Sequence, residues 1–146
     1  MKKSTKFSDV LHVLLHMAGS SVPATSESLA KAMKSNPVVV RRTMAGLRER
    51  GFVQSEKGHG GGWQLVRDLK SVTLFDVYQS IGSPIMLAIG NRASSHGCLV
   101  EKAVNSATKG AFQDAENILI TKFQETTLAD LHDIIKKSSH NHEKRK

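Results

Sequence analysis

The sequence is poor in cysteine and in long apolar segments. Cys98 is the only cysteine among 146 residues, so no internal disulfide can form and the chain fits a reducing cytoplasm. No run of about 18 apolar residues is present, so no membrane-spanning helix is expected. His12 and His16 interrupt the apolar residues near the N-terminus, so no signal peptide is predicted. These absences predict a cytoplasmic protein without a membrane partner.

Sequence motifs of common enzymes and metal sites are also missing. There is no HExxH and no GxSxG, and GHGGGWQ lacks the Lys-Ser/Thr pair of a phosphate-binding loop. His12 and His16 have the spacing of helical metal ligands, but no third ligand is evident, and we interpret them as surface histidines. An enzyme with Cys98 as nucleophile would need a base, and His96 is close only in sequence. We therefore predict no enzyme, no metal site and no cofactor.

Positive charge is the main excess in the composition. The chain has 21 Lys and Arg against 13 Asp and Glu, a formal net charge of +8, which by itself suggests a polyanionic partner only weakly. Part of this charge lies in the C-terminal sequence KKSSHNHEKRK, which we interpret as a solvated tail. A second group lies in one compact segment and consists of Arg41, Arg42, Arg48, Arg50, Lys57 and Arg67.

Hydrophobic spacing predicts three helices followed by a hairpin. The first helix covers residues 6–18, and the second covers residues 26–33 after the capping residue Thr25. Asn36 and Pro37 are favourable cap and first-turn residues for a third helix that ends near Arg50, before Gly51. Residues 52–57 and 63–66 then read as strands around a glycine turn. This order predicts a mostly α, winged helix-turn-helix fold with a two-stranded β wing.

The third predicted helix has a polar side that suits a DNA major groove. Its apolar residues share one face, whereas Arg41 and Arg42 point the other way. Arginine can pair with a guanine edge or with phosphate, and the sequence leaves both roles open. Glycines in the wing let the backbone approach a phosphate or the minor groove closely. The predicted DNA-contacting residues are Asn36, Val38, Arg41, Arg42, Lys57 and His59.

The remaining chain is predicted to be helical with one loop. Thr73 and Asp76 form a capping box ahead of a short helix, and residues 90–97 are interpreted as a loop. Residues 98–105 and 111–125 are predicted as two separate helices. A last helix is expected to begin after Thr127.

Residues 29–67 resemble the Rrf2 family of winged-helix regulators. The specific part is LRERGFVQSEKGHGGGWQLVR, residues 47–67, and VTLFDVYQSIG, residues 72–82, fits as well. The resemblance implies a transcription repressor that binds double-stranded operator DNA as a homodimer through C-terminal dimerisation helices. We assign residues 1–82 to the DNA-binding domain, 83–110 to a sensor or linker region, 111–137 to dimerisation helices and 138–146 to a basic disordered tail.

The sensing chemistry departs from part of that family. Its iron–sulfur members hold a cluster with three clustered cysteines, and only Cys98 stands in the corresponding region here, so that cluster is not expected. Cys98 is near a predicted helix start, which favours a reactive thiolate, and is a candidate redox sensor. The alternative is a small buried apolar residue. For the whole chain, the alternative function is a winged-helix protein-interaction module that does not bind DNA.

Overall fold

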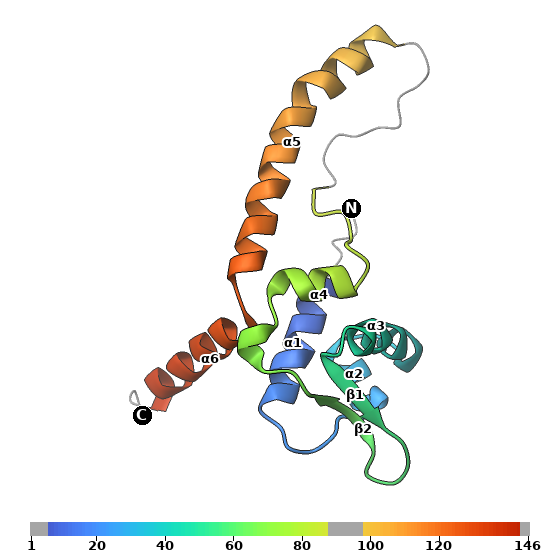
Figure 1. Cartoon of the computed structure of the whole chain (residues 1–146), viewed down its shortest axis with the longest axis vertical. Coiled ribbons are helices and arrows are strands. Elements are labelled where there is room, and N and C mark those ends of the chain that lie inside the picture. Colours follow the sequence, from blue (N-terminus) through green and yellow to red (C-terminus); the bar gives the residue numbers. More distant parts are fainter. Residues whose placement is uncertain (1–5, 88–97, 144–146) are drawn as a thin grey trace.

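The structure is a computed structural model that describes residues 6–87 and 98–143. Figure 1 shows a body built from the first four helices and a hairpin, with two further helices that leave the body in different directions. The fold is mostly helical with one two-stranded antiparallel sheet, as predicted. In chain order the elements are α1 (Lys6–Ala18), α2 (Ser26–Ala32), α3 (Pro37–Glu49), β1 (Val53–Glu56), β2 (Gly62–Leu65), the 3-10 helix η1 (Leu69–Ser71), α4 (Leu74–Ser80), α5 (Leu99–Glu125) and α6 (Leu128–Glu143).

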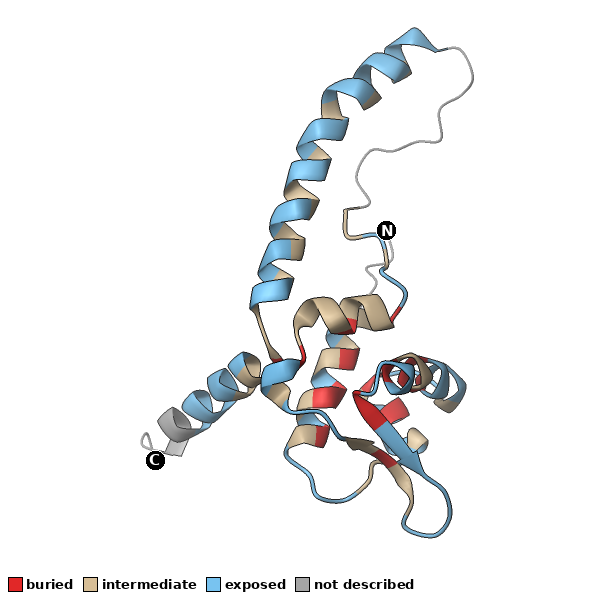
Figure 2. Ribbon diagram, viewed as in Figure 1, coloured by how far each residue is buried: buried red, intermediate tan, exposed pale blue. Residues whose placement is uncertain are grey.

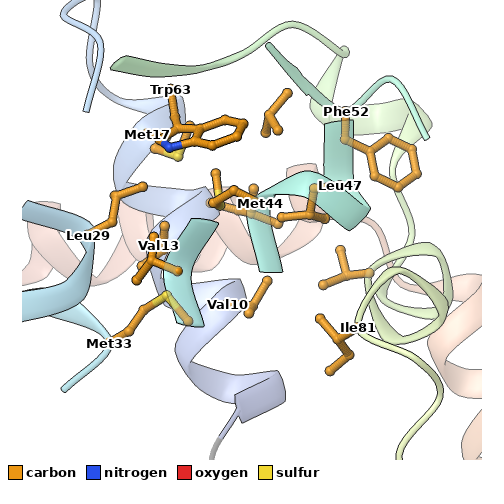
Figure 3. Close-up of a cluster of buried hydrophobic side chains, with 14 of the residues drawn as sticks. Val10, Val13, Met17, Leu29, Met33, Met44, Leu47, Phe52, Trp63 and Ile81 are labelled. Carbon is orange, nitrogen blue, oxygen red and sulfur yellow. The ribbon is translucent and has the colours of Figure 1, made fainter. Parts of the chain in front are cut away.

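A single apolar core lies around α1. Val13 and Leu14 of α1 are fully buried, and Leu29 of α2 and Met44 of α3 pack over them. Figure 2 shows the buried residues concentrated in this body, and Figure 3 shows the aliphatic side chains interleaved beneath the ring of Trp63. The core therefore holds α3 by its inner face and leaves its outer face in solvent.

The connection between α2 and α3 is a short turn with local hydrogen bonds. Thr25 caps α2, because its Oγ1 accepts a hydrogen bond from the Ser28 N–H at 3.1 Å. After α2, the N–H of Ser35 donates to the Ala30 carbonyl at 2.9 Å. Gly51 follows α3 with φ of 72°, a left-handed conformation that favours glycine. The helix-turn-helix predicted from these cap residues is confirmed.

The hairpin pairs antiparallel and is also tied to the segment before α2. Val53 pairs with Leu65, and Glu56 pairs with Gly62. Trp63 exchanges two backbone hydrogen bonds with Ala24, at 2.9 and 2.8 Å. This additional bridge fixes the base of the wing relative to the helix-turn-helix.

Helix α5 is one continuous helix, which corrects the predicted separation into residues 98–105 and 111–125. Gly110 was the expected break, but glycine in a helix costs only about 1 kcal/mol relative to alanine and does not forbid helical backbone. The 27 residues of α5 span about 40 Å. No residue of α5 is buried, and Figure 1 shows most of the helix projecting away from the body.

Helix α6 turns back across the end of the body. A capping box starts it: the Thr127 N–H and the Thr127 hydroxyl both donate to one oxygen of Asp130 at 2.8 Å. Leu128 is fully buried, and its N–H donates to the Val72 carbonyl at 2.9 Å. The helix extends to Glu143, so residues 138–143 are helical where the sequence predicted a disordered tail. Among the described helices, none is long and apolar enough to cross a membrane.

Candidate nucleic-acid interface

The N-terminal turn of α3 is exposed and capped. The Oδ1 atom of Asn36 accepts a hydrogen bond from the Val39 N–H at 3.0 Å, and Pro37 occupies the first turn, where its missing N–H costs nothing. Asn36 was predicted as a DNA contact, and the structure gives its side-chain oxygen a structural task. Val38 leaves 67% of its surface exposed at the same end. This turn therefore presents an apolar surface beside a saturated cap.

Arg41 and Arg42 lie on the exposed side of α3, as the helix periodicity predicted. Arg41 donates from Nη2 to Oε1 of Glu27 on α2 at 3.4 Å, and the two side chains are 59% and 63% exposed. An exposed ion pair of this kind contributes little, typically about 0–1 kcal/mol, so phosphate can displace Glu27. Neither arginine is packed inside the protein, and both can reach a polyanion.

Two other basic residues brace the wing. The Arg48 guanidinium donates to the Ser55 hydroxyl at 3.4 Å and lies 5.9 Å from the centroid of the Trp63 ring. The Arg67 guanidinium lies 5.9 Å from the centroid of the Phe52 ring. Contacts between cations and aromatic faces contribute about 0.5–1 kcal/mol at exposed sites. Sequence analysis counted these arginines only as positive charge and missed their role in holding β1 and β2.

Trp63 connects the wing to the helix-turn-helix. Its side chain is buried, and its Nε1–H donates to the Ser26 hydroxyl of α2 at 3.1 Å. A buried indole usually finds such a partner for its N–H. No local sequence signal could have paired Trp63 with Ser26, because the two residues are far apart in the chain.

The wing turn needs its glycines for steric reasons. A Cβ on Gly61 would lie 2.3 Å from the Glu56 carbonyl oxygen, and one on Gly62 would lie 2.7 Å from the Ala24 carbonyl oxygen. The glycine cluster is therefore a tight turn rather than a merely flexible loop. Lys57 and His59 are exposed on this turn, where the sequence predicted them to be.

Cys98 lies apart from this surface, at the first turn of α5. It is the N-cap residue, its side chain makes no capping hydrogen bond, and it is exposed. The alternative of a buried core cysteine is therefore wrong for this chain. His96 and the predicted loop at 90–97 lie outside the described residues.

Comparisons with known proteins agree with one another. The family model "Rrf2: Iron-dependent Transcriptional regulator" matches residues 3–134. An HTH-type transcriptional regulator by name, YffB of Lactococcus lactis, is 27% identical over 137 residues, which is 91% of this chain and 88% of that protein. YwgB of Bacillus subtilis, named in the same way, is 31% identical over 83 residues, and the match spans 56% of this chain and about half of that protein, 53%.

A solved structure shares the fold over the whole length. It is described as a transcriptional regulator from Lactobacillus plantarum and superposes with a TM-score of 0.72 at 22% identity. The superposition covers 98% of this chain and 99% of that one, so it includes the projecting α5 as well as the body.

Proposed function

Because the chain belongs to the Rrf2 family of transcriptional regulators, we propose that it binds operator DNA with α3 in the major groove and the wing beside it. One observation carries this proposal: Val38, Arg41 and Arg42 are exposed along a capped helix whose opposite face is embedded in the core. An α-helix fits the major groove, and a helix held rigidly from behind can be presented there without further ordering. Lys57 and His59 extend the same contact from the wing.

Specificity at the end of α3 depends on shape more than on side-chain hydrogen bonds. The oxygen of Asn36 is committed to its own helix, and Val38 offers only methyl groups. Methyl groups can contact the 5-methyl group of thymine, whereas Arg41 and Arg42 can contact guanine edges or phosphates. Replacing one operator thymine by uracil should weaken binding to the native protein and have no effect on Val38→Ala.

We also propose that the regulator is a homodimer joined along α5. Leu99 and Val100 are 79% and 72% exposed, and Ile118 is 65% exposed on a helix without any buried residue. Such a long, partly apolar helix gains stability when a second copy covers it. Two copies related by a two-fold axis would place two α3 helices on successive turns of a near-palindromic operator. Occupancy of that operator would block the promoter, which makes the protein a repressor.

Cys98 is our proposed site of signal input, as a redox or electrophile sensor. The thiol is exposed and stands at the N-terminus of α5, where the partial positive charge of a helix favours thiolate. Peroxide, diamide and nitric oxide should each change operator binding by the native protein. A Cys98→Ser variant that responds to all three to the same extent would exclude this role.

Iron–sulfur chemistry does not fit the donor set. Cys98 is the only thiol in the chain, and the described residues contain no group of three or more His, Cys, Asp or Glu arranged to hold an ion. A cluster needs several thiolates at one site. We therefore derive no regulatory step from iron, although the family description names it.

The test of the proposed DNA contact compares two charge-matched double variants. Genome-wide binding first yields the operator, and fluorescence anisotropy then measures affinity across a range of salt concentrations. Arg41→Ala/Arg42→Ala should weaken binding and reduce the log–log salt slope by up to about 1.8 per protomer. Lys136→Ala/Lys137→Ala removes the same charge from exposed positions on α6 and should leave the slope unchanged.

Equal behaviour of the two double variants would contradict the assignment of α3 as the reading helix. A native protein without salt-dependent duplex binding would instead favour the protein-interaction module. An operator without two-fold symmetry, or a monomer in sedimentation, would contradict the dimer.

A further inference from the structure

Two imidazole rings on α1 point at one another. The Nε2 atoms of His12 and His16 lie 2.7 Å apart, and the ring centroids lie 4.6 Å apart. One of these nitrogens donates and the other accepts, so at least one of the two rings has its Nε2 unprotonated. Both side chains are exposed, and neither packs into the core. The pair thus directs nitrogen atoms from one helix face toward a common point in solvent.

A third imidazole lies on the wall of the same cavity. The cavity has a volume of about 470 Å³ and is formed between α1 and α6. His132 of α6 contributes to it, and Leu15 and Ile135 complete much of its apolar lining. No carboxylate lines the cavity. Its donor groups are therefore neutral nitrogen atoms, which suit zinc, nickel and copper, and not the oxygen donors that magnesium and calcium require.

We propose that this cavity binds a divalent transition-metal ion such as Zn²⁺ through His12, His16 and His132. In a tetrahedral site with Zn–N bonds of 2.0–2.1 Å, two ligand nitrogens are about 3.3 Å apart. The observed 2.7 Å separation of His12 and His16 must therefore open by about 0.6 Å, a small adjustment of exposed side chains. Among the described residues no three ligands already surround one point, so the His132 ring must rotate toward the ion.

The ion would connect two parts of the molecule that are otherwise in limited contact. α1 is the centre of the core, and α6 begins only after the long excursion of α5. In Figure 1, α6 and α3 lie on opposite sides of α1, so the metal site is separate from the proposed DNA surface. Because the ligands must be neutral imidazoles, metal binding should weaken below about pH 6.5.

The experiment measures Zn²⁺ affinity by competition with a chromophoric chelator, using full-length protein without a histidine tag. Co²⁺ absorption in the visible range reports the number of nitrogen ligands. The background variant His140→Ala/His142→Ala removes two tail histidines that could bind metal independently. His12→Ala and His16→Ala should each weaken Zn²⁺ binding at least about tenfold, and His132→Ala should do the same and change the Co²⁺ spectrum. His59→Ala, at an exposed position on the wing, is the matched control and should have no effect.

The native protein should also melt at a higher temperature with saturating Zn²⁺, and the three histidine variants should lose that increase. Equal Zn²⁺ affinity in the native protein and in the His12→Ala and His16→Ala variants would overturn the site. An unchanged affinity and Co²⁺ spectrum in His132→Ala would overturn the connection to α6. All three altered positions are outside the core, and circular dichroism verifies that each variant is folded.

Discussion

Replacing Gly46 with alanine separates helix propensity from helix packing. Gly46 is in the interior of α3, where alanine is normally more stable than glycine by about 1 kcal/mol. In this fold, however, a Cβ on Gly46 would lie 2.4 Å from the carbonyl oxygen of Ser80 at the end of α4. The contact is with backbone, so no side-chain rotation relieves it, and α3 must move away from α4.

The expected net effect of Gly46→Ala is destabilisation. Overpacking of this severity costs about 3 kcal/mol, and the helix-propensity gain of about 1 kcal/mol leaves a net loss of about 2 kcal/mol. For a chain of this length, that loss lowers the melting temperature by roughly 4–8 °C. Thermal and urea unfolding followed by circular dichroism measure both quantities.

The matched control is Gly110→Ala in α5. A Cβ at Gly110 meets nothing within 4 Å in this protomer, so the same substitution should raise stability by about 0.5–1 kcal/mol. If Gly46→Ala stabilises the protein as much as Gly110→Ala does, then α3 and α4 are not in contact as described. The position of α3 relative to the body would then be wrong, and with it the geometry of the proposed DNA surface.

Three further predictions concern helix caps. Thr73→Ala removes both halves of the capping box with Asp76 and should cost about 0.5–2 kcal/mol in chemical unfolding, whereas Thr73→Ser should keep most of that stability. Hydrogen bonds from Thr127 lower the pKa of Asp130 below its ordinary value, so its stabilising contribution is present above about pH 3.8 and is lost as the pH falls further; the stability deficit of Asp130→Ala should therefore shrink in acid, and a deficit independent of pH would contradict this. Asn36→Ala should destabilise α3 by about 1 kcal/mol, and Asn36→Ser should restore stability; if Asn36→Ser still binds operator more weakly than the native protein, Asn36 contacts DNA in addition to capping.

The helix-turn-helix and the wing could be predicted because their signals are local. Thr25, Asn36 and Thr73 each cap a helix through a hydrogen bond to the residue three positions later, so a short stretch of sequence contains the complete signal. The structure places the α2–α3 and β1–β2 boundaries within one or two residues of those expected. The family resemblance extends over the same segments and agrees with the match to residues 3–134.

The errors and omissions have a different cause. Helix α5 makes few contacts with its own protomer, so it shows no clear apolar face, and Gly110 was given too much weight as a helix breaker. The Trp63–Ser26 hydrogen bond and the cavity shared by His16 and His132 join residues from distant elements. Tertiary folding alone creates these pairs, and hydrophobic periodicity contains no information about them.

The division of the basic residues into bound and free groups changes the salt dependence that the net charge would suggest. Arg48 and Arg67 rest against aromatic rings of the wing, which leaves Arg41, Arg42 and Lys57 as the exposed cations of this surface. A dimer that uses these three in each protomer makes about six phosphate contacts, and the logarithm of affinity should fall against that of salt with a slope of about −5. If the two bracing arginines also bound phosphate, about ten contacts would give a slope near −9. Measurement of the slope for the native protein therefore tests whether Arg48 and Arg67 serve the wing or the DNA.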